Sequence, residues 1–295
     1  MQDVFVFCKI YSKKSKQDAP PHLHYSMKYL DFKILSLIRE IIFPCACPIC
    51  GENLLERSEA FTGICKICAQ THTIDSSPRC SVCGKPLISE IGICINCRST
   101  PASEIHCLTF AIFPYLGSGA QLLHAYKFGA HRNLSRFFAA KLLDARNIQV
   151  GGTAPLPTKV CFANVFSSPP AVLGTQLPES AKSDAVWVPV PPKSGKLKVK
   201  GWDQIETIAR VLEKHQDVKV DRCLKRLAGT QSQKELGKDE RKKNLVGKII
   251  CTKAPPQNVI LFDDVYTTGS TIQTCAEVLK KEGCKNVSAI CLYYD

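Results

Sequence analysis

Two neighbouring carboxylates and a run of hydroxyl side chains give this chain its clearest chemistry. Asp263 and Asp264 are followed, after Val265 and Tyr266, by the polar turn 267–271, which consists of Thr267, Thr268, Gly269, Ser270 and Thr271. Paired carboxylates accept hydrogen bonds from vicinal hydroxyls and attract a hard cation. Hydroxyl groups, backbone N–H groups and a helix N-terminus together bind a phosphate group. The pattern therefore predicts a site for a sugar phosphate, with a metal ion close by.

A strand and a helix must present these groups. Residues 259–262 are four bulky apolar residues, which predict a short buried strand. Open α/β sheets bind ligands at the C-terminal ends of such strands. We expect a helix over 272–282 with Gly283 as its C-cap, and then a strand over 286–294. The alternative is an ordinary strand–turn–helix junction, in which Asp serves solubility and Ser or Thr caps the helix.

Eight cysteines in four Cys-x-x-Cys pairs form a second candidate site. Two residues between thiolates is the spacing at which a tight turn brings both sulfurs to one tetrahedral zinc ion. We interpret the pairs as two consecutive zinc ribbons, made of Cys47, Cys50, Cys65 and Cys68 and of Cys80, Cys83, Cys94 and Cys97. Four thiolates leave no open coordination position, so we expect one or two zinc ions with a structural role.

The spacing leaves alternatives open. The pairs could be interleaved between the two sites, and Cys45 could replace Cys47. A redox Cys-x-x-Cys is a further alternative, although it normally occurs once, on a helix after a strand. The other cysteines have no metal spacing, and we expect them to be small buried apolar residues: Cys107, Cys161, Cys223, Cys251, Cys275, Cys284 and Cys291.

Composition narrows the class of protein. The 295 residues include no apolar run of the ~18 residues needed to cross a membrane, and the N-terminus lacks the pattern of a signal peptide. We therefore predict a cytoplasmic protein that is not an integral membrane protein. The formal net charge of +13 favours an anionic partner such as nucleic acid or phosphates.

The chain divides into three predicted parts. Residues 1–26 are a disordered leader by composition, and Met27 is an alternative start of translation. Residues 27–100 form a helix, over 28–43, followed by the double zinc ribbon. Residues 101–295 form the ligand-binding domain, with an insertion at about 149–184 that is rich in Pro, Gly, Ser and Ala.

From residue 107 onward, predicted strands and helices alternate. Strand patterns cover 107–113 and 185–192, helical patterns cover 120–128 and 134–145, and a capping box at Asp203 and Glu206 opens a further helix. The fold class is therefore α/β, with a mostly parallel sheet of about five strands, helices on both faces and a small N-terminal zinc-ribbon module.

Basic residues stand where an anionic ligand would lie. Lys127 is on the last turn of the helix 120–128, where it either balances the helix dipole or contacts a ligand phosphate. The strand 185–192 ends at Pro192, and Lys193 and Lys196 come directly after it. These three residues could hold a pyrophosphate, or the lysines could form a solvated basic loop. Residues 193–253 carry 17 Lys and Arg against 8 Asp and Glu, so most of the net charge is local. A loop of that charge could close over an anionic ligand or follow a nucleic-acid backbone.

The residues 259–271 resemble the signature of type I phosphoribosyltransferases. As an ordered set, the motifs resemble more closely the ComF-type competence proteins, which combine a double zinc ribbon with such a domain. The matching motifs are the four Cys pairs, Lys127-Phe128-Gly129, Val188-Pro189-Val190-Pro191, Gly201-Trp202-Asp203-Gln204, Arg226/Thr230/Gln233, Arg241/Asn244 and the diacid signature. Trp202-Asp203 departs from the usual Phe-Asn, and lysines replace the arginines of the basic turn, which weakens the expected grip on pyrophosphate.

The resemblance implies a ligand and a process. The ligand is phosphoribosyl pyrophosphate with Mg²⁺: Asp263 and Asp264 on the ribose and the turn 267–271 on the 5′-phosphate. The family also implicates Lys127, Arg226, Gln233 and Arg241. The process is natural transformation, in which incoming single-stranded DNA is handled beside a helicase and a membrane channel, at the inner face of the membrane.

Two classes of function stay open. One is a module that binds phosphoribosyl pyrophosphate and holds single-stranded DNA or a partner protein. The other is an active phosphoribosyltransferase of nucleotide salvage or amidophosphoribosyl transfer, in which positioning and electrostatics supply the catalysis.

Overall fold

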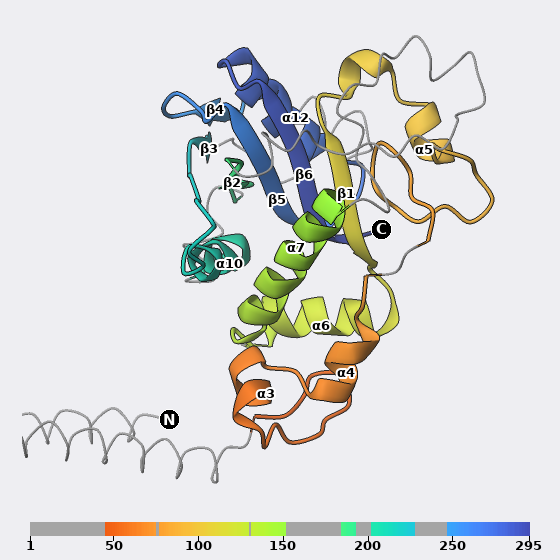
Figure 1. Cartoon of the computed structure of the whole chain (residues 1–295), viewed down its shortest axis with the longest axis vertical. Coiled ribbons are helices and arrows are strands. Elements are labelled where there is room, and N and C mark those ends of the chain that lie inside the picture. The colour runs from red at the N-terminus through yellow and green to blue at the C-terminus, as the bar shows by residue number, and fades with distance from the viewer. Residues whose placement is uncertain (1–44, 75–76, 130, 152–183, 193–201, 228–246) are drawn as a thin grey trace, which may run out of the picture. The chain divides into compact units, whose positions relative to one another are not determined.

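The computed structural model describes residues 45–74, 77–129, 131–151, 184–192, 202–227 and 247–295 (Figure 1). The predicted leader 1–26, the predicted helix 28–43 and nearly all of the predicted insertion lie outside these residues. So do Lys193, Lys196, Gln233 and Arg241.

A four-stranded parallel sheet organises the described residues after the zinc ribbons. Its strands are β1 (Leu108–Pro114), β2 (Val186–Pro189), β5 (Asn258–Tyr266) and β6 (Asn286–Tyr294). They lie in the order β1-β6-β5-β2, and every pairing is parallel. The predicted α/β class with a mostly parallel sheet is confirmed, with four strands in the main sheet where we expected about five.

Side chains of alternate residues in the central strands pack into two separate cores, one on each face of the sheet. In β5, Ile260 and Phe262 belong to one buried cluster, whereas Val259 and Leu261 belong to the other. A parallel sheet buried on both faces needs apolar side chains at successive positions. The continuous apolar run 259–262 is therefore the sequence signature of a sheet covered on both sides.

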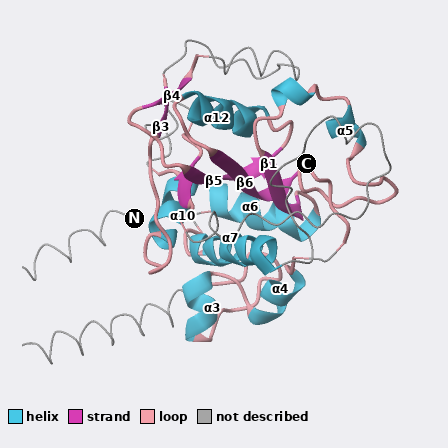
Figure 2. Ribbon diagram, turned by 45° about the horizontal axis from the view of Figure 1, so that its top comes forward, coloured by secondary structure: helices cyan, strands magenta, loops and turns pink. Residues whose placement is uncertain are grey.

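Helices cover both faces (Figure 2). α6 (Gly117–Phe128), α7 (Leu134–Gly151) and α10 (Gln204–Leu212) contribute to one core, and α12 (Ser270–Lys281) packs on the other face. Asp203 caps α10, because its carboxylate accepts a 2.8 Å hydrogen bond from the N–H of Glu206. The helix predicted over 134–145 runs on to Gly151, so the first residues of the predicted insertion belong to α7.

A short antiparallel pair, β3 (Leu224–Arg226) and β4 (Ile249–Cys251), stands apart from the main sheet. The sequence did not predict it, because each strand has only three residues and they include Lys225 and Arg226. These strands bring the two ends of the basic tract 227–248 together, since the N–H of Leu227 donates to the carbonyl of Lys248 at 2.7 Å.

The first zinc ribbon carries α3 (Arg57–Thr62) and α4 (Lys66–Thr71) and packs against α7. The side-chain amide of Asn133 donates to the Ala60 carbonyl at 2.9 Å, and the Arg136 guanidinium lies 4.2 Å from the centre of the Phe61 ring. His72 is buried with its ring edge-on to Phe113 and Phe137. This ribbon therefore shares a core with the sheet.

The second zinc ribbon carries α5 (Ile95–Arg98), is followed by the 3-10 turn η1 (Ala102–Glu104) and joins the outer edge of β1. The Arg79 guanidinium donates to the carbonyls of Gly84 and Ala111, at 2.8 and 2.7 Å, and lies over the Phe110 ring. The prediction of a zinc-ribbon module N-terminal to the sheet is confirmed, and both ribbons are built into its packing.

Among the described residues, every helix is too short or too polar to cross a membrane.

Candidate functional site

The two acids lie within β5 and not after it. We expected the strand to end at Phe262, but β5 continues to Tyr266 and stays paired with β6, with Asp263 opposite Cys291 and Tyr266 opposite Tyr294. Polar residues extend a strand here because the neighbouring strand offers an unbroken ladder of hydrogen-bonding groups.

Successive residues of a strand point to opposite faces, and the two carboxylates diverge accordingly. Asp264 lies on the side of α6, where its Oδ2 is 2.7 Å from the Nζ of Lys127. Asp263 lies on the other face, which it shares with Val259 and Leu261 and which packs against α12. Burial lowers the pKa of Arg226 on β3, and the negative charge of Asp263 opposes that shift. The Oδ1 of Asp263 also accepts a 2.8 Å hydrogen bond from the N–H of Asp264.

The turn 267–271 follows directly and opens α12. Gly269 is the N-cap residue with φ 76°, and it provides no side-chain cap to the helix. The hydroxyls of Thr268 and Ser270 are 2.9 Å apart, and the N–H of Ser270 lies 3.4 Å from the Thr268 hydroxyl oxygen. Thr267 is exposed, and Thr268, Ser270 and Thr271 are half-buried. Hydroxyls and the N-terminal N–H groups of a helix are thus grouped at one solvent-accessible point, as a phosphate site requires.

Gly269 is required by close packing as well as by its dihedral angle. A Cβ atom at this position would lie 2.3 Å from the Tyr266 hydroxyl oxygen. Tyr266 is buried, and that burial raises the pKa of its phenol. The turn is therefore folded tightly over the end of its own strand.

Three buried thiols, those of Cys107, Cys275 and Cys291, belong to the core on the α12 side of the sheet. Burial raises the pKa of Cys275 and of Cys291, and the negative charge of Asp263 adds to the shift in both. Burial likewise raises the pKa of Cys107 to about 12. These cysteines, together with Cys223 and Cys284, are buried, as the sequence predicted, and Cys251 is half-buried. Cys161 lies outside the described residues.

Lys127 and Arg226 are the basic candidates that the structure brings to the acids, one from α6 and one from β3. Pro192 is half-buried just past β2, which neighbours β5 in the sheet. The N–H of Val190 donates to the carbonyl of Phe262 at 3.1 Å, so the chain entering the predicted pyrophosphate turn runs beside the acids.

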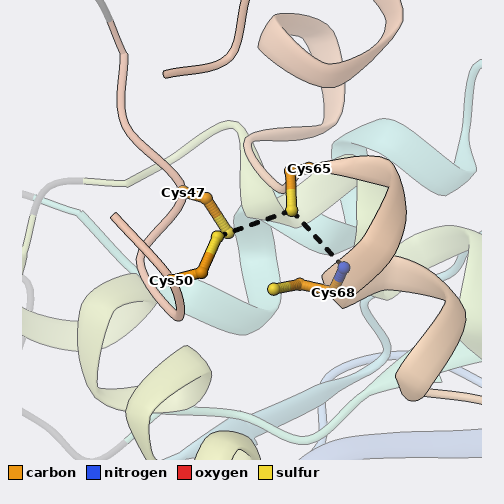
Figure 3. A group of neighbouring side chains, drawn as sticks. All are labelled: Cys47, Cys50, Cys65 and Cys68. Carbon is orange, nitrogen blue, oxygen red and sulfur yellow. Dashed lines mark hydrogen bonds between the residues drawn. The ribbon is translucent and has the colours of Figure 1, made fainter. Parts of the chain in front are cut away.

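The eight paired cysteines gather into two groups of four, in the sequential order Cys47, Cys50, Cys65, Cys68 and Cys80, Cys83, Cys94, Cys97. Figure 3 shows the first group, in which a turn supplies two side chains and the start of α4 supplies the other two. The interleaved arrangement is not seen, and Cys45 is exposed outside both groups.

The sulfur geometry fits zinc. Four Zn–S bonds of about 2.3 Å in a tetrahedron place sulfurs about 3.8 Å apart, and the Cys50–Cys65 and Cys83–Cys94 sulfurs are both 3.7 Å apart. Backbone N–H groups point at the sulfurs: that of Cys68 lies 3.4 Å from the Cys65 sulfur, and that of Cys94 lies 3.3 Å from the Cys80 sulfur. Gly51 and Gly84, with φ 77° and 68°, complete the two knuckle turns. All eight thiolates are thus available for two structural zinc ions.

Magnesium is a different case. Carboxylate oxygens suit Mg²⁺, but this ion is usually held by one or two carboxylates together with the phosphates of a substrate. Asp263 and Asp264 can serve as such ligands. Among the described residues, Asp264 forms an ion pair with the Lys127 ammonium group.

Two residues that link the modules escaped the sequence analysis. The Gln273 side chain on α12 accepts from the N–H groups of His106 and Cys107, at 2.6 and 3.0 Å, and donates to the Cys107 carbonyl at 2.9 Å. Arg79 anchors the second ribbon to β1. A glutamine on a helix and an arginine in a loop carry no local signal of such roles, because their partners are far away in sequence.

Comparisons with known proteins agree with the cysteine pattern. Residues 38–98 match the family described as a double zinc ribbon domain. Over 236 residues the chain is 24% identical to the DNA utilization protein YhgH of Escherichia coli K12, covering 78% of this chain and 89% of that protein. Over 250 residues it is 24% identical to competence protein F of Haemophilus influenzae, and the match covers 82% of this chain and 93% of that protein. The chain is thus similar, over most of its length, to proteins named for competence and DNA utilization.

Proposed function

We propose that this chain binds phosphoribosyl pyrophosphate at the C-terminal end of β5 and acts in the handling of incoming DNA during natural transformation. One observation supports this ligand above all: two acids on β5 are joined to the N-terminus of α12 by the last two residues of the strand and a tight, hydroxyl-rich turn. A ligand with vicinal hydroxyls next to a phosphate matches both halves of that arrangement.

Each part of the ligand has a proposed partner. Asp263 and Asp264 accept hydrogen bonds from the ribose hydroxyls, with one of the two diverging carboxylates turning toward the sugar when it binds. The turn 267–271 donates N–H and O–H groups to the 5′-phosphate. The pyrophosphate lies toward Pro192, Lys193 and Lys196, where lysines offset its charge. When Mg²⁺ is bound, it neutralises part of the pyrophosphate charge.

The names of the relatives support the role in DNA handling, because they refer to competence and to DNA utilization. The basic surplus of residues 193–253 is suited to a single-stranded DNA backbone. In this proposal the protein works in the cytoplasm, at the inner face of the membrane, with the helicase and channel of DNA uptake as partners.

The alternative proposal is an active phosphoribosyltransferase. It is favoured by the position of Pro192 just past β2, the strand next to β5, since a leaving pyrophosphate would be held there. A nitrogen nucleophile would form its bond to C1 of the ribose while the bond from C1 to the pyrophosphate oxygen breaks. The chain's own residues would contribute positioning and electrostatic stabilisation.

A ligand profile and a transformation assay test these proposals. Thermal unfolding with phosphoribosyl pyrophosphate should show a clear rise in midpoint, whereas ribose 5-phosphate and pyrophosphate alone should give smaller rises, because each fills half of the site. Pyrophosphate release with candidate acceptors would support the enzyme, and binding without release would support the module.

A strain carrying Asp264→Asn should lose transformation, while Asp217→Asn, an exposed aspartate on the segment after α10, should not. Equal transformation by both variants, each with normal zinc content, would contradict the proposed role of the ligand site in DNA handling.

A further inference from the structure

Lys127 and Asp264 form an unusually enclosed ion pair. Their charged atoms are 2.7 Å apart, and the two side chains are only 21% and 15% exposed. By contrast, Lys281 in its pair with Glu277 is 71% exposed, and Lys253 in its pair with Asp221 is 59% exposed. Enclosed pairs are screened far less by water and salt than surface pairs.

The neighbouring residue fixes where Lys127 points. Tyr126 is fully buried, and its hydroxyl donates a 2.7 Å hydrogen bond to the carbonyl of Gln204 at the start of α10. Its ring also packs edge-on against Phe138 and Trp202. These contacts set the rotation of the last turn of α6, so Lys127 reaches the carboxylate from a rigid position.

A helix-dipole role alone does not explain the placement. A lysine that serves only the C-terminal end of a helix interacts with the last carbonyl groups and stays solvated. The Lys127 ammonium instead contacts a carboxylate on a central strand, at the position where the sequence predicted a ligand.

We propose that Lys127 is a built-in counter-ion of the ligand site: it neutralises Asp264, and so allows an anionic sugar phosphate to bind with little help from a divalent cation. The inference rests on the proposed function. A pair of uncompensated carboxylates repels a pyrophosphorylated sugar unless Mg²⁺ screens the charges. An ammonium group held beside one carboxylate supplies that screening from within the protein and also holds the carboxylate in place for the ribose hydroxyls.

The test is calorimetric titration with phosphoribosyl pyrophosphate, with Mg²⁺ and in Mg²⁺-free buffer without a chelator that would remove zinc, of the wild-type protein, Lys127→Met and Lys141→Met. Lys141 is the matched control, because it is a helical lysine, 17% exposed and paired with Asp144 at 3.4 Å, outside the ligand site. In the wild type and in the control, omission of Mg²⁺ should weaken binding by less than about tenfold. In Lys127→Met, omission of Mg²⁺ should weaken binding by about a hundredfold or more.

Two outcomes are decisive against the inference. If Lys127→Met shows the same dependence on Mg²⁺ as the wild type, Lys127 is not the counter-ion, although the proposed ligand stands. If the wild type fails to bind phosphoribosyl pyrophosphate even in Mg²⁺, the proposed function falls and this inference falls with it.

A measurement without the sugar phosphate covers the case in which the variant folds poorly. Millimolar Mg²⁺ alone should raise the unfolding midpoint of Lys127→Gln, whose carboxylate is uncompensated, and leave the midpoints of the wild type and of Lys127→Arg unchanged. The amount of zinc bound per chain is measured for each variant, as a check that the variant is folded. A wild-type midpoint that rises with Mg²⁺ as much as that of Lys127→Gln would overturn the proposal.

Discussion

The N–H of Thr109 donates a 2.8 Å hydrogen bond to the carbonyl of Val82. Val82 lies inside the turn of the second zinc ribbon, between Cys80 and Cys83, and Thr109 lies on β1, an outer strand of the sheet. The zinc turn thus covers part of a strand edge that would otherwise be open to pairing. We infer that the second ribbon stabilises the sheet directly.

Glycine substitutions in the two zinc turns test this contact. Gly84→Ala would place a Cβ atom 2.6 Å from the Cα of Phe110, whereas the same change at Gly51 meets no atom within 4 Å. Both glycines have positive φ, so each alanine costs about 1–2 kcal/mol of backbone strain. We expect the free energy of unfolding to fall by about 1–3 kcal/mol more in Gly84→Ala than in Gly51→Ala, because the added methyl group overpacks the contact with β1. Equal losses in chemical denaturation would show that the turn is not docked on β1.

Zinc removal should destabilise the whole described fold. Cys83→Ser should bind about one zinc ion per chain in place of two, since one tetrahedral site has lost a thiolate. We expect a large fall in the unfolding midpoint, because the second ribbon shares a core with β1 and α12. Cys45→Ser is the control, as Cys45 lies outside both groups. A Cys83→Ser protein with full zinc content and an unchanged midpoint would refute the assignment.

Thiol alkylation of the native protein should be selective. The pKa of Cys107 is raised to about 12 by burial, so at pH 8 only about one molecule in ten thousand carries the thiolate. Cys45 is exposed and should react first. Mass spectrometry after brief treatment with iodoacetamide should find Cys45 labelled and Cys107, Cys275 and Cys291 unlabelled. Labelling of the three buried thiols at a similar rate would show that the core on the α12 side of the sheet is open to solvent.

The polar turn should tolerate no side chain at Gly269. Gly269→Ala brings a Cβ atom to 2.3 Å from the Tyr266 hydroxyl oxygen, so either the ring or the turn must move. We expect affinity for phosphoribosyl pyrophosphate to fall about tenfold or more, since a displaced turn loses its N–H contacts to the phosphate. Gly283→Ala, at φ 97° with no atom within 4 Å, is the matched control at the other end of α12. Unchanged affinity in Gly269→Ala would argue against phosphate binding at this turn.

Much of the fold could be read from local patterns. The apolar run 259–262 predicted a strand buried on both faces, and Asp203 with Glu206 predicted the start of α10, because strand burial and helix capping depend on nearby residues. The two cysteine groups followed from spacing for the same reason: a Cys-x-x-Cys turn positions two ligands by itself.

The features that the sequence did not predict have one cause in common: each depends on a partner residue that is far away in the sequence. Asp263 to Tyr266 became strand because β6 pairs with them, and nothing in those four residues favours a strand end at Tyr266 over Phe262. Lys127 had two equal interpretations on sequence, and neither included its ion pair with Asp264, which lies on a strand more than a hundred residues later. Gln273 and Arg79 likewise act on distant backbone groups.

Titration of the folded protein with phosphoribosyl pyrophosphate in Mg²⁺, for the wild type, Asp264→Asn and Asp217→Asn, tests the central claim most directly. We predict saturable binding with one ligand per chain in the wild type and in Asp217→Asn, and affinity weaker by about tenfold or more in Asp264→Asn, because a charged hydrogen-bond acceptor for the ribose is lost. A wild-type protein with normal zinc content that gives no binding signal, or an Asp264→Asn variant that binds as tightly as the wild type, would contradict it.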